Sequence, residues 1–180
     1  AVLTEDEKEV GVAMVEIGAQ TTNVAAYYEG KIHHVAILPF GGATLTQDLM
    51  RGLAVPYKEA QRAKEHHSHA FAQMVDPRET VDLPGPSPNQ MRSVACELIA
   101  HIVEQRLDEM FGIIQGELQD HGVAEKLGAG IVLSGGSASI PGITELAQQI
   151  FAAPVRLGVP AEGLGGIADV VARPRFTVGA

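Results

Sequence analysis

The alternation of apolar and polar positions is clearest in residues 11–28. Residues 12–17 are almost continuously apolar, as in a strand buried on both faces, and residues 24–27 begin a second apolar run. The more polar segment 16–23 carries a glycine, which permits turn conformations that other residues resist. The pattern predicts a strand, a turn and a second strand, and residues 31–38 continue it as a third strand of the same meander.

Helical periodicity dominates the middle of the chain. Leucines at intervals of four predict an amphipathic helix over residues 43–53, and residues 57–70 resume a helical composition after Pro56. Residues 79–83 predict a short strand, and residues 91–119 predict a long helix. The apolar stripe expected on this helix comprises Val94, Leu98, Ile102, Leu107, Met110, Ile113, Ile114 and Leu118.

The last third of the chain returns to strand and helix patterns. Residues 131–133 predict a short buried strand, residues 143–151 a helix and residues 154–157 an edge strand, because a proline at its start removes a ladder donor. Residues 1–9 are polar and acidic, and we expect a lead-in to the first strand without a motif. Proline and glycine predict loops at residues 84–88, 163–166 and 173–174. Together these elements indicate a mixed α/β sheet with a smaller unit inserted.

Composition restricts the class of protein. The chain has 180 residues, of which 46% are hydrophobic and 19% charged, so a globular domain with a real core is expected. A net charge of −9 argues against general affinity for nucleic acid or an anionic membrane surface. Cys96 is the single cysteine, so no intrachain disulfide can form, which is compatible with a reducing cytoplasm. Without a signal peptide or a membrane-spanning apolar run, we expect a soluble product.

Three glycine-bearing turns are candidates for phosphate binding. After the first strand, Gly18 and Thr21 can form a nest of backbone N–H groups beside the carboxylate of Glu16, which suits a magnesium–polyphosphate ligand. Gly41 and Gly42 follow the third strand, and the pair 135–136 follows the strand at 131–133. A plain structural hairpin is the alternative for the first turn, and a helix start that needs small residues is the alternative for the second.

These turns resemble those of the actin-like ATPase superfamily, and in particular the FtsA family of bacterial cell-division proteins. The first turn typically reads DIGGGTxD in that family and stands here as EIGAQTTN at residues 16–23, a degenerate match. The later turn typically reads GIVLTGGxAxIxG, and GIVLSGGSASIPG at residues 130–142 matches it almost residue for residue. The second motif is specific.

The resemblance covers nearly the whole chain and implies the second half of an actin-like ATPase, with a ribonuclease-H-like fold. Residues 1–52 and 129–180 correspond to subdomain IIA, the nucleotide-binding core. Residues 53–128 correspond to subdomain IIB, a smaller α/β insertion. The chain begins at Ala1 and ends where the family approaches a further helix, so we expect a fragment.

The resemblance implies that ATP and Mg²⁺ are the ligands, with Glu16 holding Mg²⁺ through water. A family motif that reaches the adenosine, AExxK, has Gln61 here in place of the Glu and keeps Lys64; a solvated helix face is the alternative. Gly18, Thr21, Gly41, Gly42, Gly135 and Gly136 are the remaining expected nucleotide-binding residues, and Gly136 is expected to adopt positive φ beside the base. Because Ala19 and Gln20 replace family glycines, we expect weak or no hydrolysis and no catalytic residues.

A partner site is implied on the predicted long helix. The family's EPR-type motif stands here as Glu104-Gln105-Arg106, and both Arg92 and Arg106 match family arginines near the surface that receives the carboxy-terminal peptide of FtsZ. If both arginines lie on one helix, they are about four turns apart and share a face. Two exposed arginines on a solvated face are the alternative.

The resemblance therefore implies a cytoplasmic, ATP-binding division protein that polymerises and tethers FtsZ filaments to the inner face of the membrane at the division site. The membrane contact in that family is a terminal helix that is absent from this chain, and no nucleic-acid partner is expected. Two rivals share the fold: a pilus-assembly relative, and an enzyme such as a sugar kinase or a chaperone-type ATPase.

The histidines are expected to be structural. His33 and His34 are adjacent on a strand and point to opposite faces, so they cannot easily chelate one metal ion together. His66 and His69 are three apart on a predicted helix, but no cysteine and no nearby group of carboxylates completes a metal site in the sequence.

Overall fold

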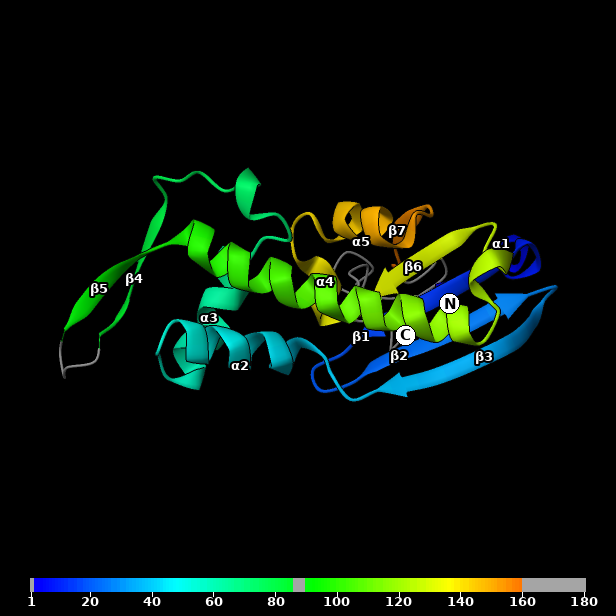
Figure 1. The fold of residues 1–180 in the computed structure, drawn as a ribbon, viewed down its shortest axis with the longest axis horizontal. Coiled ribbons are helices and arrows are strands. Elements are labelled where there is room, and N and C mark those ends of the chain that lie inside the picture. Colours follow the sequence, from blue (N-terminus) through cyan, green and yellow to red (C-terminus); the bar gives the residue numbers. More distant parts are fainter. Residues whose placement is uncertain (1, 86–89, 160–180) are drawn as a thin grey trace, which may run out of the picture.

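The centre of the molecule is a five-stranded mixed sheet with the strand order β3-β2-β1-β6-β7 (Figure 1). A computed structural model describes residues 2–85 and 90–159. The strands of this sheet are β1 (Val12–Ile17), β2 (Thr22–Tyr28), β3 (Lys31–Leu38), β6 (Gly130–Ser134) and β7 (Val155–Leu157). β1, β2 and β3 form the expected antiparallel meander, and β6 pairs in parallel with both β1 and β7. The predicted mixed sheet and its proline-led edge strand are confirmed.

One long helix crosses a face of this sheet, and the other helices lie beside the sheet or beyond one end of it (Figure 1). The helices are α1 (Glu5–Val10), α2 (Gly42–Gly52), α3 (Tyr57–His67), α4 (Cys96–Asp120) and α5 (Ile143–Phe151), with 3-10 turns η1 (Ala72–Met74), η2 (Ala124–Lys126) and η3 (Gly136–Ser139). A separate hairpin of β4 (Thr80–Pro84) and β5 (Met91–Ala95) lies at the end of α4 that is remote from the sheet (Figure 1). Within residues 2–85 and 90–159, no helix has the length and apolar character needed to cross a membrane.

The main core forms between the sheet and α4. Alternate residues of β1, such as Val15 and Ile17, point into it, as expected for a strand with period two. From α4, Leu107, Phe111 and Ile114 are fully buried against them. The opposite face of the sheet carries a smaller cluster of Val2, Val12 and Val132. The sheet is therefore buried on both faces near β1 and β6, which explains why β1 is nearly continuous in apolarity.

The long helix begins at Cys96, so the predicted start at Met91 is wrong. Residues 91–95 are instead β5, paired antiparallel with β4 in the register Val81 to Val94. Val94 lies four residues before Leu98, a spacing that also suits a helix, and this coincidence extended the helical pattern into the strand. Leu98 and Ile113 are each 45% exposed, and the buried stripe of α4 runs through Ile99, Ala100, Val103, Leu107, Met110, Phe111, Ile114 and Leu118.

The amino-terminal segment contains a helix that was not predicted. Thr4 caps α1 by accepting a hydrogen bond from the Glu7 N–H at 3.1 Å, and the Glu7 carboxylate accepts one from the Thr4 N–H at 2.8 Å. This reciprocal pair is a capping box, and its sequence signature, Thr-x-x-Glu, was present at residues 4–7. Glu7 also receives two hydrogen bonds from Arg156, which attaches α1 to β7.

The remaining sequence expectations concern boundaries. α3 ends at His67, three residues before the predicted end, because Ser68 adopts an extended conformation. The predicted loop at 84–88 lies largely outside the described residues, and the loops at 163–166 and 173–174 lie entirely outside them. The subdomain division at residues 53–128 stays a prediction; α4 extends from the hairpin to the sheet, and its Gln115 donates to the Ile150 carbonyl of α5 at 2.8 Å.

The packing of α4 predicts unequal effects for two of its apolar residues. Replacing buried Phe111 by alanine should destabilise the fold by about 3–5 kcal/mol, because it leaves a cavity between α4 and the sheet. Replacing Ile113, which is 45% exposed on the same helix, should cost less than about 1 kcal/mol. Urea denaturation of the two variants measures this difference, and equal losses would contradict the assigned burial.

Candidate functional site

A pocket of about 530 Å³ lies between α3 and the turn that follows β6. Its size falls in the range of small-molecule sites. Three glycines from three separate turns reach it, and residues of α3 and η3 also line it. The lining residues are Gly18, Ala19, Gly42, Gln61, Lys64, Glu65, His66, Ser68, Gly136, Ser137, Ser139, Ile140 and Pro141. The predicted site residues Gly18, Gly42, Gln61, Lys64 and Gly136 are thus brought together.

The base of the site is a backbone junction between the β1–β2 turn and α2. The Gly18 N–H closes the turn on the Thr21 carbonyl at 3.0 Å, and the Gly42 N–H donates to the Gly18 carbonyl at 2.9 Å. A Cβ atom at Gly41 would lie 2.6 Å from that same Gly18 oxygen, so only glycine fits. The glycine pair therefore allows α2 to start against the turn, and the Gly42 N–H is used within the protein rather than directed at a ligand.

The two glycines after β6 have different roles. Gly135 has φ +88°, and a Cβ atom there would collide with the backbone of Ile17. Gly136 does not have positive φ, which corrects the sequence expectation, and a Cβ atom built on it meets no heavy atom within 4 Å among the described residues. Gly135 is therefore required by the packing of β6 against β1, whereas Gly136 borders open space in the pocket.

Helix α3 contributes the charged wall of the pocket. Lys64 Nζ donates to the Gly42 carbonyl oxygen at 2.9 Å, and burial lowers the pKa of this ammonium group from its ordinary value. Gln61 Oε1 accepts from the Thr46 hydroxyl at 2.7 Å, and the Gln61 amide donates to Glu65. Lys64 has three donors and uses one on the carbonyl, so it can offer another to an anion in the pocket.

The other predicted site residues lie outside the pocket lining. The Glu16 carboxylate accepts a hydrogen bond from the Asn23 amide at 3.1 Å, one strand over, and Thr21 is exposed at the turn. The neighbouring Thr22 is fully buried and donates to the Phe40 carbonyl at 2.8 Å, so its hydroxyl serves the fold. Gly41 and Gly135 lack side chains that would collide with the backbone of Gly18 and Ile17, so they allow the segments of the junction to approach closely.

Several residues that line the pocket, or that support its lining from outside as Thr46 does, were not predicted from the sequence. The Thr46 hydroxyl shares its single hydrogen between Gln61 Oε1 at 2.7 Å and the Gly42 carbonyl at 3.0 Å, and no local signal distinguishes this residue from other helical threonines. Ser137 follows the Gly135-Gly136 pair directly, so its position in the motif was available as a signal. Glu65 follows Lys64 directly in the sequence. Its contact with Gln61, four residues earlier, forms because both residues lie on one side of helix α3.

The two arginines proposed as a partner site do not share a helix face, which corrects the sequence expectation. Arg92 lies in β5, because residues 91–95 pair with β4, whereas Arg106 lies on α4. Arg106 donates from Nη2 to Asp48 Oδ1 at 3.1 Å and also contacts Asp48 Oδ2 and Glu109. The hydrogen bond to Asp48 raises the pKa of its guanidinium. Two guanidinium nitrogens of Arg92, Nε and Nη2, are buried with no hydrogen-bond partner in the described part of the chain.

Sequence comparison places this chain beside cell-division proteins. The family model described as cell division protein FtsA matches residues 13–180. Cell division protein FtsA of Neisseria meningitidis is 42% identical over 178 residues, covering 98% of this chain and 43% of that protein. FtsA of Pseudomonas aeruginosa is 40% identical over 179 residues, covering 99% of this chain and 43% of that protein. The chain thus spans less than half the length of these curated relatives.

Solved structures share the fold at low identity. MreB5 of Spiroplasma citri bound to AMPPNP has a TM-score of 0.72 at 17% identity, over 85% of this chain and 50% of that one. A chain of the PilM–PilN type IV pilus biogenesis complex has a TM-score of 0.69 at 15% identity, over 97% of this chain and 45% of that one. A MamK double helical filament has a TM-score of 0.62 at 17% identity, over 93% of this chain and 54% of that one. The predicted actin-like α/β half, with a mixed sheet and flanking helices, is confirmed.

The contrast between Gly135 and Gly136 predicts a large difference between adjacent substitutions. Gly135→Ala should destabilise the protein by at least about 2 kcal/mol, because it forces a side chain into positive φ and against Ile17. Gly136→Ala should change stability by no more than about 0.5 kcal/mol. Thermal and urea denaturation compare the two, and a destabilised Gly136→Ala with a normal Gly135→Ala would reverse the assignment.

Proposed function

Because the chain belongs to the FtsA family of cell-division proteins, we propose that it binds ATP and tethers filaments of FtsZ to the inner face of the cytoplasmic membrane at the division site. The chain is an actin-like cell-division protein by family and fold. The observation that carries the ATP proposal is the pocket in which three glycine turns meet Lys64. Since the chain spans 43% of its curated relatives, the activity of the whole protein is part of the proposal.

The pocket suits the adenosine part of the nucleotide. Gly136 leaves open space on one side, and Gln61 and Lys64 offer polar groups on the other. The exposed turn at Gly18 and Thr21 would receive the phosphates, and the Glu16 carboxylate would hold Mg²⁺ through water. The MreB5 structure that shares this fold is bound to AMPPNP, an ATP analogue, which supports a nucleotide as the ligand.

Hydrolysis is expected to be weak or absent. Ala19 and Gln20 are exposed on the β1–β2 turn at positions where the family motif has glycines, and their side chains limit the approach of the backbone to phosphate. The Ala19 carbonyl is already used by the Ala43 N–H at 2.7 Å, which holds this turn in place. ATP is then a bound ligand rather than a rapidly consumed substrate.

Nucleotide binding is tested by calorimetric titration of Mg-ATP into the full protein and three variants. Gly136→Val should abolish binding, because its side chain projects into the open part of the pocket. Lys64→Met should weaken binding about 10- to 100-fold, as expected for the loss of one hydrogen bond from a charged donor. Lys58→Met on the exposed part of the same helix is the matched control and should bind normally.

Thermal denaturation of each variant separates lost binding from lost folding. If the folded wild-type protein bound neither ATP nor ADP, the nucleotide proposal would be wrong. Rapid phosphate release by the wild-type protein would instead favour the enzyme alternative on this fold.

For the FtsZ peptide, the structure shifts the emphasis to Arg92. Arg106 is held by Asp48, and only 29% of the Arg106 side chain is exposed, so it must release an intramolecular partner before it can bind a carboxylate. Nε and Nη2 of Arg92 have no acceptor in the described part of the chain, so the side chain can turn outward to an acceptor on a peptide without breaking an ion pair among these residues. An acidic peptide that docks beside the β4–β5 hairpin would supply one, and the chain's net charge of −9 would repel it elsewhere.

The arginines are tested by titrating a labelled carboxy-terminal FtsZ peptide against charge-reversal variants. Arg92→Glu should weaken binding at least about tenfold, whereas Arg106→Glu should cost no more than about fivefold, the range of an exposed ion pair. Arg62→Glu, an exposed residue of α3, changes the net charge equally and serves as the control. Equal affinity of the Arg92→Glu and Arg62→Glu variants would remove Arg92 from the site.

Self-association completes the proposal. The MamK structure that shares this fold is a double helical filament, and we expect polymers of this protein built from its actin-like body. A role in pilus assembly is the alternative, since a chain of the PilM–PilN complex has the same fold. The identity of 42% to a cell-division protein, against 15% to that chain, favours division.

A further inference from the structure

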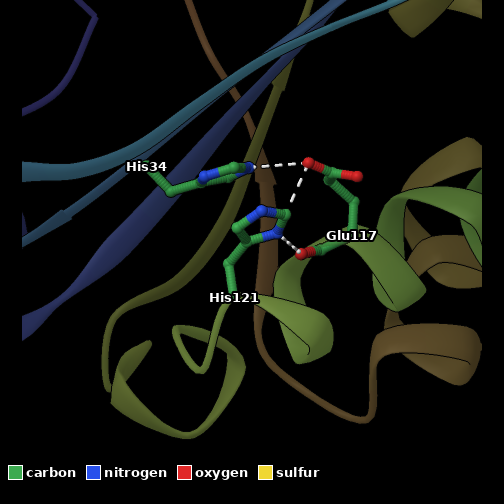
Figure 2. Close-up of side chains that lie close together, drawn as sticks. All are labelled: His34, Glu117 and His121. Carbon is green, nitrogen blue, oxygen red and sulfur yellow. Dashed lines mark hydrogen bonds and ion pairs between the residues drawn. The ribbon is translucent and has the colours of Figure 1, made fainter.

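A cluster of two histidines and a glutamate joins β3 to the end of α4, far from the pocket. Figure 2 shows the rings of His34 and His121 facing each other, with Glu117 beside both. His34 Nε2 lies 2.8 Å from Glu117 Oε1, and His121 Nδ1 lies 3.5 Å from the same oxygen. The two imidazoles are stacked with centroids 3.9 Å apart and an interplanar angle of 23°. One possible ligand atom from each of the three residues lies within 4.8 Å of the other two.

We propose that His34, Glu117 and His121 bind a divalent transition-metal ion of the zinc class. Two imidazoles and one carboxylate are a donor set that Zn²⁺ commonly takes, with a water molecule as the fourth ligand. Glu117 and His121 are four residues apart on α4 and therefore project from one side of the helix. The site is independent of the proposed nucleotide and partner functions.

The three side chains are close enough together for one ion to reach all of them. Bonds of about 2.0–2.2 Å at tetrahedral angles place neighbouring donor atoms about 3.3 Å apart. His34 Nε2 and Glu117 Oε1, 2.8 Å apart, are within about half an ångström of this value, and the three residues each place one ligand atom within 4.8 Å of the others. To bind the ion, the two stacked imidazoles must turn apart until a lone pair of each ring points at it. The hydrogen bond between His34 and Glu117 is then replaced by two bonds to the ion.

Burial and hydrogen bonding also favour a defined site. The His34 side chain is 13% exposed and Glu117 27%, whereas His121 is 49% exposed, so an ion can enter on the side of His121. His121 Nδ1 donates to the Glu117 backbone carbonyl at 2.8 Å, which leaves Nε2 as the nitrogen with a free lone pair. Such a second hydrogen bond, from the ring nitrogen that is not the ligand, orients most metal-binding histidines.

The sequence did not indicate this site, because its residues are far apart along the chain. His33 and His34 do point to opposite faces, as expected; His33 contacts the Tyr28 carbonyl at 3.1 Å, whereas His34 points to α4. The partners of His34 therefore come from α4 rather than from its neighbour on the strand. His33 provides a control on the same strand that should not take part.

A second cluster could also hold a metal and must be separated in the test. The fold brings His67 and Glu79 to Cys96, which corrects the expectation that no cysteine lies near the histidines of α3. This cluster is less well arranged: His67 Nδ1 is 4.0 Å from Glu79, which is 57% exposed, and burial raises the pKa of the Cys96 thiol, so a metal must displace its proton. Its sulfur gives bound Co²⁺ a ligand-to-metal charge-transfer absorption that the histidine–glutamate cluster cannot produce.

The test is a titration of Zn²⁺ and Co²⁺ into the full protein after removal of any affinity tag. His34→Ala, Glu117→Gln and His121→Ala should each weaken Zn²⁺ binding at least about tenfold, since even an outer-shell partner of a metal typically costs 10- to 100-fold. His33→Ala and Cys96→Ser should bind as the wild type does. Bound Co²⁺ should show tetrahedral d–d bands without the sulfur charge-transfer absorption, and Zn²⁺ should raise the melting temperature of the wild type but not of His34→Ala.

Glu117→Gln keeps the size of the side chain, and melting curves without metal show whether each variant is folded. Unchanged affinity in a folded Glu117→Gln and in a folded His34→Ala would overturn the proposal. Loss of binding in Cys96→Ser together with sulfur absorption would assign the ion to the other cluster, which also overturns it. Absence of any Zn²⁺ binding by the wild-type protein would leave the three residues as a hydrogen-bonded contact between β3 and α4.

Discussion

The close approach of three backbone turns at the end of β1 is the constraint on which the rest of the structure depends. The carbonyl oxygens of Ile17 and Gly18 occupy the space that a side chain at Gly135 or Gly41 would need. Because these segments meet without side chains, β6, α2 and the β1–β2 turn converge within a small volume. The pocket is the space left on the outer side of this junction, so its position follows from the packing of the fold.

The Gly42 carbonyl links this junction to α3. It accepts hydrogen bonds from both Lys64 Nζ and the Thr46 hydroxyl, and Thr46 in turn orients Gln61. Lys64 is half-buried beside a carbonyl, and the loss of water lowers the pKa of its ammonium group, although the nearby Glu65 carboxylate opposes this shift. A bound anion would offset the lost hydration of Lys64, so the electrostatics and the geometry of the pocket favour the same class of ligand.

Local features of the fold could be predicted from the sequence, whereas contacts between distant residues could not. The buried strands and the glycine motif at 130–142 have strong periodic or compositional signals, and the structure places them as expected. The β5 strand was missed because Val94 fits both a strand and a helix, and this error put Arg92 on the wrong element. The bond of Arg106 to Asp48 and that of His34 to Glu117 join residues 58 and 83 positions apart, which no local pattern encodes.

The length of α4 has a mechanical consequence. Arg106 attaches the middle of this helix to Asp48 of α2, whose first residue, Gly42, borders the pocket. From Arg106 back to Cys96 the helix rises about 15 Å at about 1.5 Å per residue, and β5 continues directly from its end. A tilt of about 5° around this attachment therefore displaces the start of the helix by about 1.3 Å, while Leu107 next to the pivot hardly moves. The helix thus couples α2, which borders the pocket, to the hairpin at its own start.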